Sequence, residues 1–278
     1  MPQHKHLHWF EHNQGLFKVI CHYCVDVDGP EIHSRNAMPW SRLFLVGAHS
    51  GGTGSRVTDI AAPAGRRAFP LAPGAVVFMP PGRLLGFDFH ADMRMIAFHF
   101  RLETIPGHDV FTGATGCALR SDRRELVAMA YEAIRGEGDL ERVMRLRGVL
   151  TLLIAEFLKG DLAGLQRRHE SHHRFLEVLQ HIEANCRADL RSAELAGLMG
   201  LSREHFTREF RAQLGKAPKE FIADRLVERA CARLLAGEAV GEVARALGFA
   251  SPFYFSRFFK ARTGIAPSRF DLGRLSPA

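Results

Sequence analysis

The chain has 278 residues, which is enough for two domains with separate hydrophobic cores. Its hydrophobic fraction of 46% and charged fraction of 24% are ordinary for a globular protein, and it holds no run of 18 apolar residues that could cross a membrane. The net charge of +7 is concentrated in residues 171–278, which hold 17 Lys and Arg but only 12 Asp and Glu. Such an excess is expected of a region that contacts phosphates.

The N-terminal segment and the cysteines indicate the compartment. The first residues, MPQHKHLHWFEHNQ, lack the apolar stretch of a signal peptide. The chain has five cysteines, an odd number that does not suit a framework of disulfides. We therefore expect a protein of the reducing cytoplasm with no membrane partner.

Residues 1–115 read as short strands. Apolar runs at 43–46, 76–79 and 95–100 are separated by turn segments such as GAHSGGTGS and PPG. Gly and Pro recur too often for long helices, so an all-β sandwich or barrel is predicted. The segment CHYC places Cys21 and Cys24 three residues apart. This pair leaves two readings open: inert thiols beside a strand, or a thiol or metal sensor.

Helical periodicity begins near Ser121, which suits the N-cap of a first helix. A second helix over 140–159 carries apolar residues at spacings of 3, 4, 3 and 4, namely Val143, Leu146, Leu150, Leu153 and Phe157. This seam either packs on the β-rich part or forms a homodimer contact. The polar, basic segment 161–173 is predicted to be a linker whose histidines are solvated.

The last hundred residues contain an internal repeat. Gly200 corresponds to Gly248 at an offset of 48, and Phe206 and Phe210 correspond to Phe255 and Phe259 at an offset of 49. Each unit reads as a helix-turn-helix, in which the glycine ends the first helix and a serine caps the second. Phenylalanines four residues apart share the buried face of that second helix, and basic residues occupy the other face. A helix over 218–235 joins the two units, which suits two reading helices in successive major grooves.

The segment GFASPFYFSRFFKARTGIAPSRF resembles the second helix-turn-helix of the AraC/XylS family of bacterial transcription regulators. LAGLMGLSREHFTREFRAQLG is similar to the first unit of that family, and APKEFIADRLVERACARLL to its linker helix. The resemblance implies an α+β fold class: a cupin-like β-barrel with following helices, then an all-α domain of two helix-turn-helix units joined by a linker helix. The corresponding domains are 1–160 for effector binding and dimerisation (β-rich 1–115, helices 121–159), a linker at 161–173, and a DNA-binding domain at 174–278.

Carried over by position, the resemblance implies that particular side chains face double-stranded DNA. They are Glu204, His205, Thr207, Arg208 and Arg211 on the first reading helix, and Pro252, Phe253, Tyr254, Ser256, Arg257 and Lys260 on the second. Arg208 and Arg257 suit bases or phosphates, because a guanidinium can bridge two acceptors. Phe253 and Tyr254 have two open readings, contact with thymine methyls and sugars or packing in the core.

The N-terminal part resembles the cupin-like effector domain of the same family. GAVVFMPPG matches the second conserved box of cupins, but Leu85 stands where metal-binding cupins have a His, and GGTGSRVTDIAAPAG holds no His. A metal-dependent cupin enzyme is therefore disfavoured, and we expect no enzymatic activity, catalytic residue, metal or cofactor. Candidate effector contacts are the polar and aromatic residues of the predicted strands, Trp40, Arg42, His49, Arg94 and His99.

These patterns predict a DNA-binding transcription regulator whose N-terminal domain senses a small molecule, dimerises through helix 140–159, or does both. RNA polymerase is a further partner that such a role would involve. The alternatives left open are a cupin-type metal-dependent enzyme and a thiol sensor that uses Cys21 and Cys24.

Overall fold

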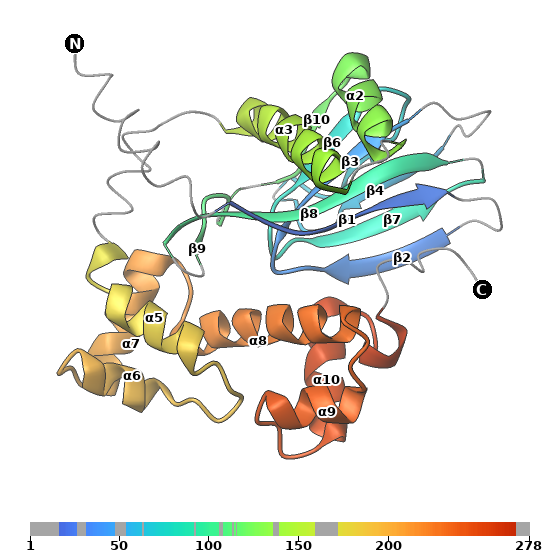
Figure 1. The fold of residues 1–278 in the computed structure, drawn as a ribbon. Helices are drawn as coiled ribbons and strands as arrows, with labels where there is room; N and C mark the ends of the chain where they lie inside the picture. Colours follow the sequence, from blue (N-terminus) through green and yellow to red (C-terminus); the bar gives the residue numbers. More distant parts are fainter. Residues whose placement is uncertain are drawn as a thin grey trace, which may run out of the picture. The chain divides into compact units, whose positions relative to one another are not determined.

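The computed structural model describes residues 17–26, 32–47, 54–62, 64–91, 93–105, 108–112, 114, 116–135, 139–158 and 172–270. Two compact units are present, and each is described by itself (Figure 1). The β unit comprises residues 19–100 and 114–160, and the helical unit comprises 101–113 and 161–270. The predicted linker at 161–173 lies outside the described residues except for His172 and His173.

The strands follow the short apolar runs of the sequence. They are β1 (Phe17–Asp26), β2 (Ile32–Ala37), β3 (Ser41–Val46), β4 (Arg56–Asp59), β5 (Arg67–Pro70), β6 (Val76–Met79), β7 (Leu84–Phe89), β8 (Arg94–Ile105), β9 (His108–Asp109) and β10 (Ala118–Arg120). One sheet has the order β1-β8-β3-β6-β10, with β9 paired to β8, and the other has the order β2-β7-β4-β5. The registered pairs beyond β1 are antiparallel. Among the described residues the strands thus form two sheets and not the single closed barrel that the cupin resemblance implied.

The core of the β unit lies between these two sheets. Phe44, Val77 and Ala97 belong to the first sheet, Phe87 and Phe89 to the second, and all five are buried in one cluster. Alternate residues of each strand point into this layer, as the period of two in a pleated sheet requires.

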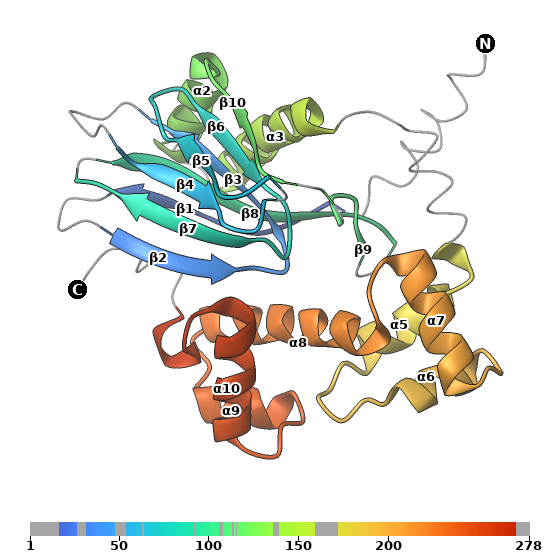
Figure 2. The ribbon, with the colours of Figure 1, turned by 180° about the vertical axis from the view of Figure 1, so that it is seen from behind.

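Two helices, α2 (Arg124–Arg135) and α3 (Asp139–Phe157), cover the outer face of the first sheet (Figure 2). Leu146, Leu150 and Leu153 of the predicted seam are buried, and Phe157 stacks on Phe78 of β6 with ring centroids 5.2 Å apart. The seam therefore packs on the β unit, which decides between its two readings. The first helix begins at Arg124, so the prediction of an N-cap at Ser121 is wrong.

The helical unit contains the two predicted helix-turn-helix pairs. Its helices are α5 (Leu176–Ala184), α6 (Ser192–Leu198), α7 (Arg203–Leu214), α8 (Pro218–Leu235), α9 (Val240–Ala246) and α10 (Pro252–Thr263), followed by the 3₁₀ turn η2 (Pro267–Arg269). The long helix α8 has α6 and α7 at one end and α9 and α10 at the other (Figures 1 and 2). His172, predicted to be a solvated linker residue, is buried, and its Nε2 lies 2.8 Å from the backbone oxygen of Gln213.

Candidate nucleic-acid interface

The reading helix of the first unit, α7, is built as the repeat predicted. Gly200 adopts a φ of 63°, and the Ser202 hydroxyl accepts a hydrogen bond from the backbone N–H of His205 at 3.3 Å. Phe206 and Phe210 are fully buried, with ring centroids 5.4 Å apart. These contacts fix the inner face of α7 and leave its opposite face to solvent.

The outer face of α7 carries the residues predicted to contact DNA. Glu204, Arg208 and Arg211 are exposed, whereas His205 and Thr207 are partly covered. The Thr207 hydroxyl donates a hydrogen bond to the backbone oxygen of Arg203 at 2.7 Å, so its proton is already used within the helix. The structure thus brings these five side chains onto one surface, where Arg208 and Arg211 are the most accessible cations.

Arg208 is not a freely rotating side chain. Its Nη2 lies 3.2 Å from His205 Nδ1, and His205 Nε2 lies 2.7 Å from Glu209 Oε1. Arg174 completes the chain, with Nη1 3.0 Å from Glu209 Oε2. The hydrogen bond from His205 and the charge of Arg174 hold the pKa of Glu209 below its usual range. The contacts orient the guanidinium of Arg208 before any ligand is bound.

A groove of about 760 Å³ lies beside α7 and is lined by Arg191, Arg203, Thr207 and Lys219, among others. The three cations come from the segment before α6, the first turn of α7 and the first turn of α8. Sequence reasoning did not include them among the DNA contacts: Arg191 and Lys219 lie outside the repeated unit 200–215, whereas Arg203 lies inside it. The sequence did offer one indication: Arg203 lies four residues before Thr207, so the two residues share one face of the predicted helix.

The second reading helix, α10, presents a different surface. Gly248 adopts a φ of 74°, and the Ser251 hydroxyl accepts a hydrogen bond from the Tyr254 backbone N–H at 3.4 Å. Phe255 and Phe259 are fully buried, but Phe253 is 64% exposed and Tyr254 60% exposed. The structure therefore rejects the core reading of these two aromatic residues.

Basic residues surround the exposed aromatic pair. The guanidinium carbon of Arg257 lies 5.8 Å from the centroid of the Phe253 ring, within the range of a cation–π contact. Ser256 is partly covered, whereas Pro252 and Lys260 are exposed. Helix α10 contains no Asp or Glu, so its outer face is apolar and cationic, whereas α7 mixes both charges.

The linker helix α8 forms ion pairs with residues at the ends of both reading helices. Asp224 of α8 accepts Lys216 Nζ at 2.6 Å on one carboxylate oxygen and lies 3.5 Å from Arg262 Nη1 on the other. Lys216 follows α7, and Arg262 ends α10. One carboxylate thus connects the ends of both reading helices, consistent with a fixed spacing between them.

Comparisons with known proteins agree with this geometry. A family described as a helix-turn-helix domain matches residues 195–272. The MmsAB operon regulatory protein of Pseudomonas aeruginosa is 25% identical over 222 residues, covering 73% of this chain and 67% of its own. The arabinose operon regulatory protein of Escherichia coli is 27% identical over 232 residues, covering 74% and 75%. These similarities support assignment to the AraC/XylS family of regulators.

Other relatives match over a smaller share of their length. The uncharacterised regulator YfiF of Bacillus subtilis is 32% identical over 136 residues, which span 48% of this chain and 43% of YfiF. Among solved structures, an apo variant of ToxT from Vibrio cholerae has a TM-score of 0.60 and 14% identity, covering 93% of this chain and 97% of that one. This likeness shows a shared fold.

Three of the predicted effector contacts meet inside the β unit. Trp40, Arg42 and His99 are buried, and Trp40 Nε1 donates a hydrogen bond to His99 Nδ1 at 2.8 Å. Arg42, paired across the strands with His99, donates to Asn36 Oδ1 at 2.6 Å, and its guanidinium carbon lies 5.2 Å from the centroid of Phe87. Burial, with a smaller contribution from the charge of Arg42, holds the pKa of His99 well below its usual range.

The other two predicted effector contacts do not join this cluster. Arg94 is exposed and lines a separate surface groove with Arg124 and Arg135. His49 lies outside the described residues. The five effector contacts therefore stay a prediction, and the structure brings three of them together.

The described residues offer no group of three or more His, Cys, Asp or Glu arranged to hold a metal ion. Cys21 and Cys24 fall in β1, and their side chains lie outside the described part of the structure. Cys117 and Cys186 are buried, and burial raises the pKa of their thiols to about 12 and about 11 respectively. Across the described ranges, no helix is long and apolar enough to span a membrane.

Proposed function

We propose that this AraC/XylS protein is a sequence-specific DNA-binding transcription regulator that contacts DNA through α7 and α10. The observation that carries the proposal is the division of each helix between a buried phenylalanine pair and an exposed basic face. A helix anchored in this way can enter the major groove without exposing its core. The acidic Glu204 on α7 and the aromatic Phe253 and Tyr254 on α10 support different base preferences for the two helices.

Selection of bound duplexes from a random pool tests this function. The wild-type protein should enrich two short motifs, and Arg208→Ala and Arg257→Ala should each relax the preference within one motif. A bidentate arginine contact discriminates between bases by about 1–3 kcal/mol, so each change should weaken binding about 5- to 150-fold. Arg67→Ala provides a control, because Arg67 is an exposed arginine on β5 of the β unit, which contains neither reading helix. Binding that ignores sequence, or that responds equally to all three changes, would contradict the proposal.

We also propose that the β unit is a cupin-like domain that binds a small anionic effector at the cluster of Trp40, Arg42 and His99. A buried arginine beside a neutral imidazole and an indole N–H provides a cation, a second polar group and apolar walls. ToxT, which shares the fold, has been crystallised with an unsaturated fatty acid bound. Thermal unfolding with a panel of small carboxylates should show stabilisation that Arg42→Gln removes and Arg94→Gln retains.

A homodimer through the outer face of α3 is a further part of the proposal. Four of the five seam residues are buried in the β unit, but the fifth, Val143, is exposed, as are Leu140, Met144 and Leu152 of α3 and Met129 of α2. Gly148 lies among them, and an added Cβ there would meet no atom within 4 Å, which permits close approach of a second helix. Glu132 and Arg147 border the same groove and could pair reciprocally across a two-fold axis. Light scattering should find a dimer that Met144→Glu converts to a monomer, whereas Glu125→Ala should leave it intact.

A further inference from the structure

The end of β8 and the short strand β9 belong to the helical unit, although the rest of β8 belongs to the β unit. Glu103 of β8 pairs with Asp109 of β9 in a hairpin whose described residues are 101–105 and 108–112. Asp109 shapes this hairpin, because its two carboxylate oxygens accept the backbone N–H of Phe111 at 2.8 Å and of Leu102 at 3.1 Å. The hairpin is thus a preformed element that contacts the helices of this unit.

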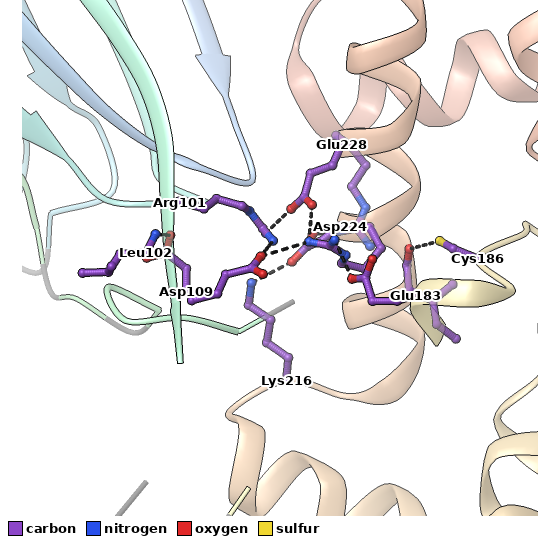
Figure 3. Close-up of polar contacts among 12 residues, drawn as sticks. Arg101, Leu102, Asp109, Glu183, Cys186, Lys216, Asp224 and Glu228 are labelled. Carbon is purple, nitrogen blue, oxygen red and sulfur yellow. Dashed lines mark hydrogen bonds and ion pairs between the residues drawn. The ribbon is translucent and has the colours of Figure 1, made fainter. Parts of the chain in front are cut away.

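Charged side chains join the hairpin to α8 and α5 (Figure 3). Arg101 pairs with Glu103 on its own strand and with Glu228 of α8. Arg225 of α8 pairs with Glu228 one turn further on, with Glu103 of the hairpin at 3.5 Å, and with Glu183 of α5 at 2.5 Å. Arg101, Glu103 and Arg225 are buried. We refer to these five residues as the hairpin network.

Burial makes the hairpin network dependent on all its members. Removing charges from water is costly, and mutual pairing repays the cost only when every partner is present. Losing Arg101 would take a cation away from two carboxylates, Glu103 and Glu228, in a site shielded from water. Docking of the hairpin on α8 is therefore expected to be strong when both arginines are present and weak when one of them is removed or reversed.

The network also holds more carboxylates than cations. The charged groups that act on Glu228 are Arg101 and Glu103 of the hairpin and Asp224 and Arg225 of α8. Asp109, Glu183 and Lys216 lie in the same cluster (Figure 3), and Arg229 pairs with Glu183. Burial, with the neighbouring Glu103 and Asp224, raises the pKa of Glu228 to about 7, despite the opposing effect of two arginines. Burial likewise raises the pKa of Asp109 to about 6. The docked hairpin therefore takes up protons near neutral pH.

Strand β8 runs from the effector cluster to this network without a break. His99, which bonds to Trp40, precedes Arg101 by two residues on the same strand. The partner helix α8 carries Asp224, which connects the ends of both reading helices. A change in the β unit that alters the end of β8 thus reaches the helix that holds the two readers.

We propose that the hairpin network is the coupling site between effector binding and DNA reading, with the β8–β9 hairpin as the element that docks on α8. The inference rests on the proposed function and adds to it the residues that carry regulation. Because coupling is reciprocal, DNA bound to α7 and α10 must change the stability of hairpin docking. The buried ion pairs between the hairpin and α8 form one arrangement whose stability depends both on effector binding and on DNA binding.

Hydrogen exchange of the full chain, with and without a selected DNA duplex, tests the proposal. In the wild-type protein, amides of residues 101–112 should change their exchange rate by about fivefold or more when DNA binds. Arg101→Glu should abolish this response, and the double variant Arg101→Glu with Glu228→Arg should restore it. The conservative variant Glu228→Gln keeps the shape of the side chain. It should remove most of the difference in hairpin protection between pH 6 and pH 8 that remains after the intrinsic pH dependence of exchange is subtracted, and leave the smaller part that Asp109 contributes.

The outcomes separate the inference from the function on which it rests. If the wild-type protein binds DNA specifically and hairpin exchange stays the same, the coupling is refuted and the DNA-binding function stands. If Glu228→Gln keeps the response of hairpin exchange to DNA but the double variant Arg101→Glu with Glu228→Arg does not restore it, the network is not the coupling site. If no specific DNA binding is found, the function and the inference fall together. Arg94→Glu, an exposed change on the same strand, should leave the response intact.

Discussion

Phe253 and Phe255 provide a sharp test of the division between core and reading surface. They lie two residues apart on α10, yet Phe253 is 64% exposed and Phe255 is fully buried. A phenylalanine has roughly 200 Å² of surface, so about 130 Å² of Phe253 is open to a ligand. At about 25 cal/mol per Å², complete coverage by DNA would contribute about 3 kcal/mol and half coverage about 1.5 kcal/mol. Phe253→Ala should therefore weaken DNA binding about tenfold.

The same substitution at Phe255 should act on stability. Truncating a fully buried phenylalanine costs about 3–5 kcal/mol, which in a helical region of about a hundred residues lowers the Tm by more than about 10 °C. Phe253→Ala should change the Tm by less than about 3 °C, because its ring contacts mainly Tyr254 and Arg257. Fluorescence anisotropy with a selected duplex at fixed salt, together with thermal unfolding, measures both quantities. Equal losses of Tm in the two variants, or unchanged DNA affinity in Phe253→Ala, would refute the reasoning.

Three further outcomes are expected. Gly200→Ala should lower the free energy of unfolding by about 1 kcal/mol, because φ is positive although the space around an added Cβ is open. Gly248→Ala should lower it by about 1 kcal/mol more, because its Cβ would lie 3.2 Å from the Cβ of Arg187. Equal losses for the two variants in denaturant unfolding would disprove this. The stability of the helical unit should fall by about 2 kcal/mol between pH 5.5 and pH 8, because the folded-state pKa of Glu228 is raised from 4.5 to about 7 and its proton is lost as pH rises; Glu228→Gln should flatten this slope in urea titrations. Cys117 and Cys186 should resist a thiol reagent at pH 8 until the protein unfolds, and mass spectrometry of the native protein would reveal any early labelling.

The helical unit was the more predictable part of the fold, because its signals are local. A glycine at each turn, a serine at each cap and phenylalanines at i and i+4 appear in sequence order and recur in register. The structure places Gly200, Gly248, Ser202 and Ser251 in those roles. Each role depends on backbone geometry within a few residues, so a single sequence is sufficient to reveal it.

The parts that sequence reasoning missed depend on distant partners. The seam on α3 has the same spacing whether it meets a sheet of its own chain or a second copy, and only the contact of Phe157 with Phe78 decides between them. His172 looked like a solvated residue because its partner, Gln213, is 41 residues away. The pair of Arg101 with Glu228 spans 127 residues, and nothing near either residue indicates the other.

The salt link at Asp224 has a consequence for the DNA that this protein reads. Helix α8 has 18 residues and a length of about 27 Å, and its Asp224 pairs both with Lys216, which follows α7, and with Arg262, near the end of α10. A spacer of this kind cannot stretch to follow DNA, whose successive major grooves recur every 34 Å or so. Base substitutions in a target promoter should therefore lower affinity in small steps. Insertion of a single base pair between the two contact segments should do more harm than any one substitution, because it rotates one segment away from its reader.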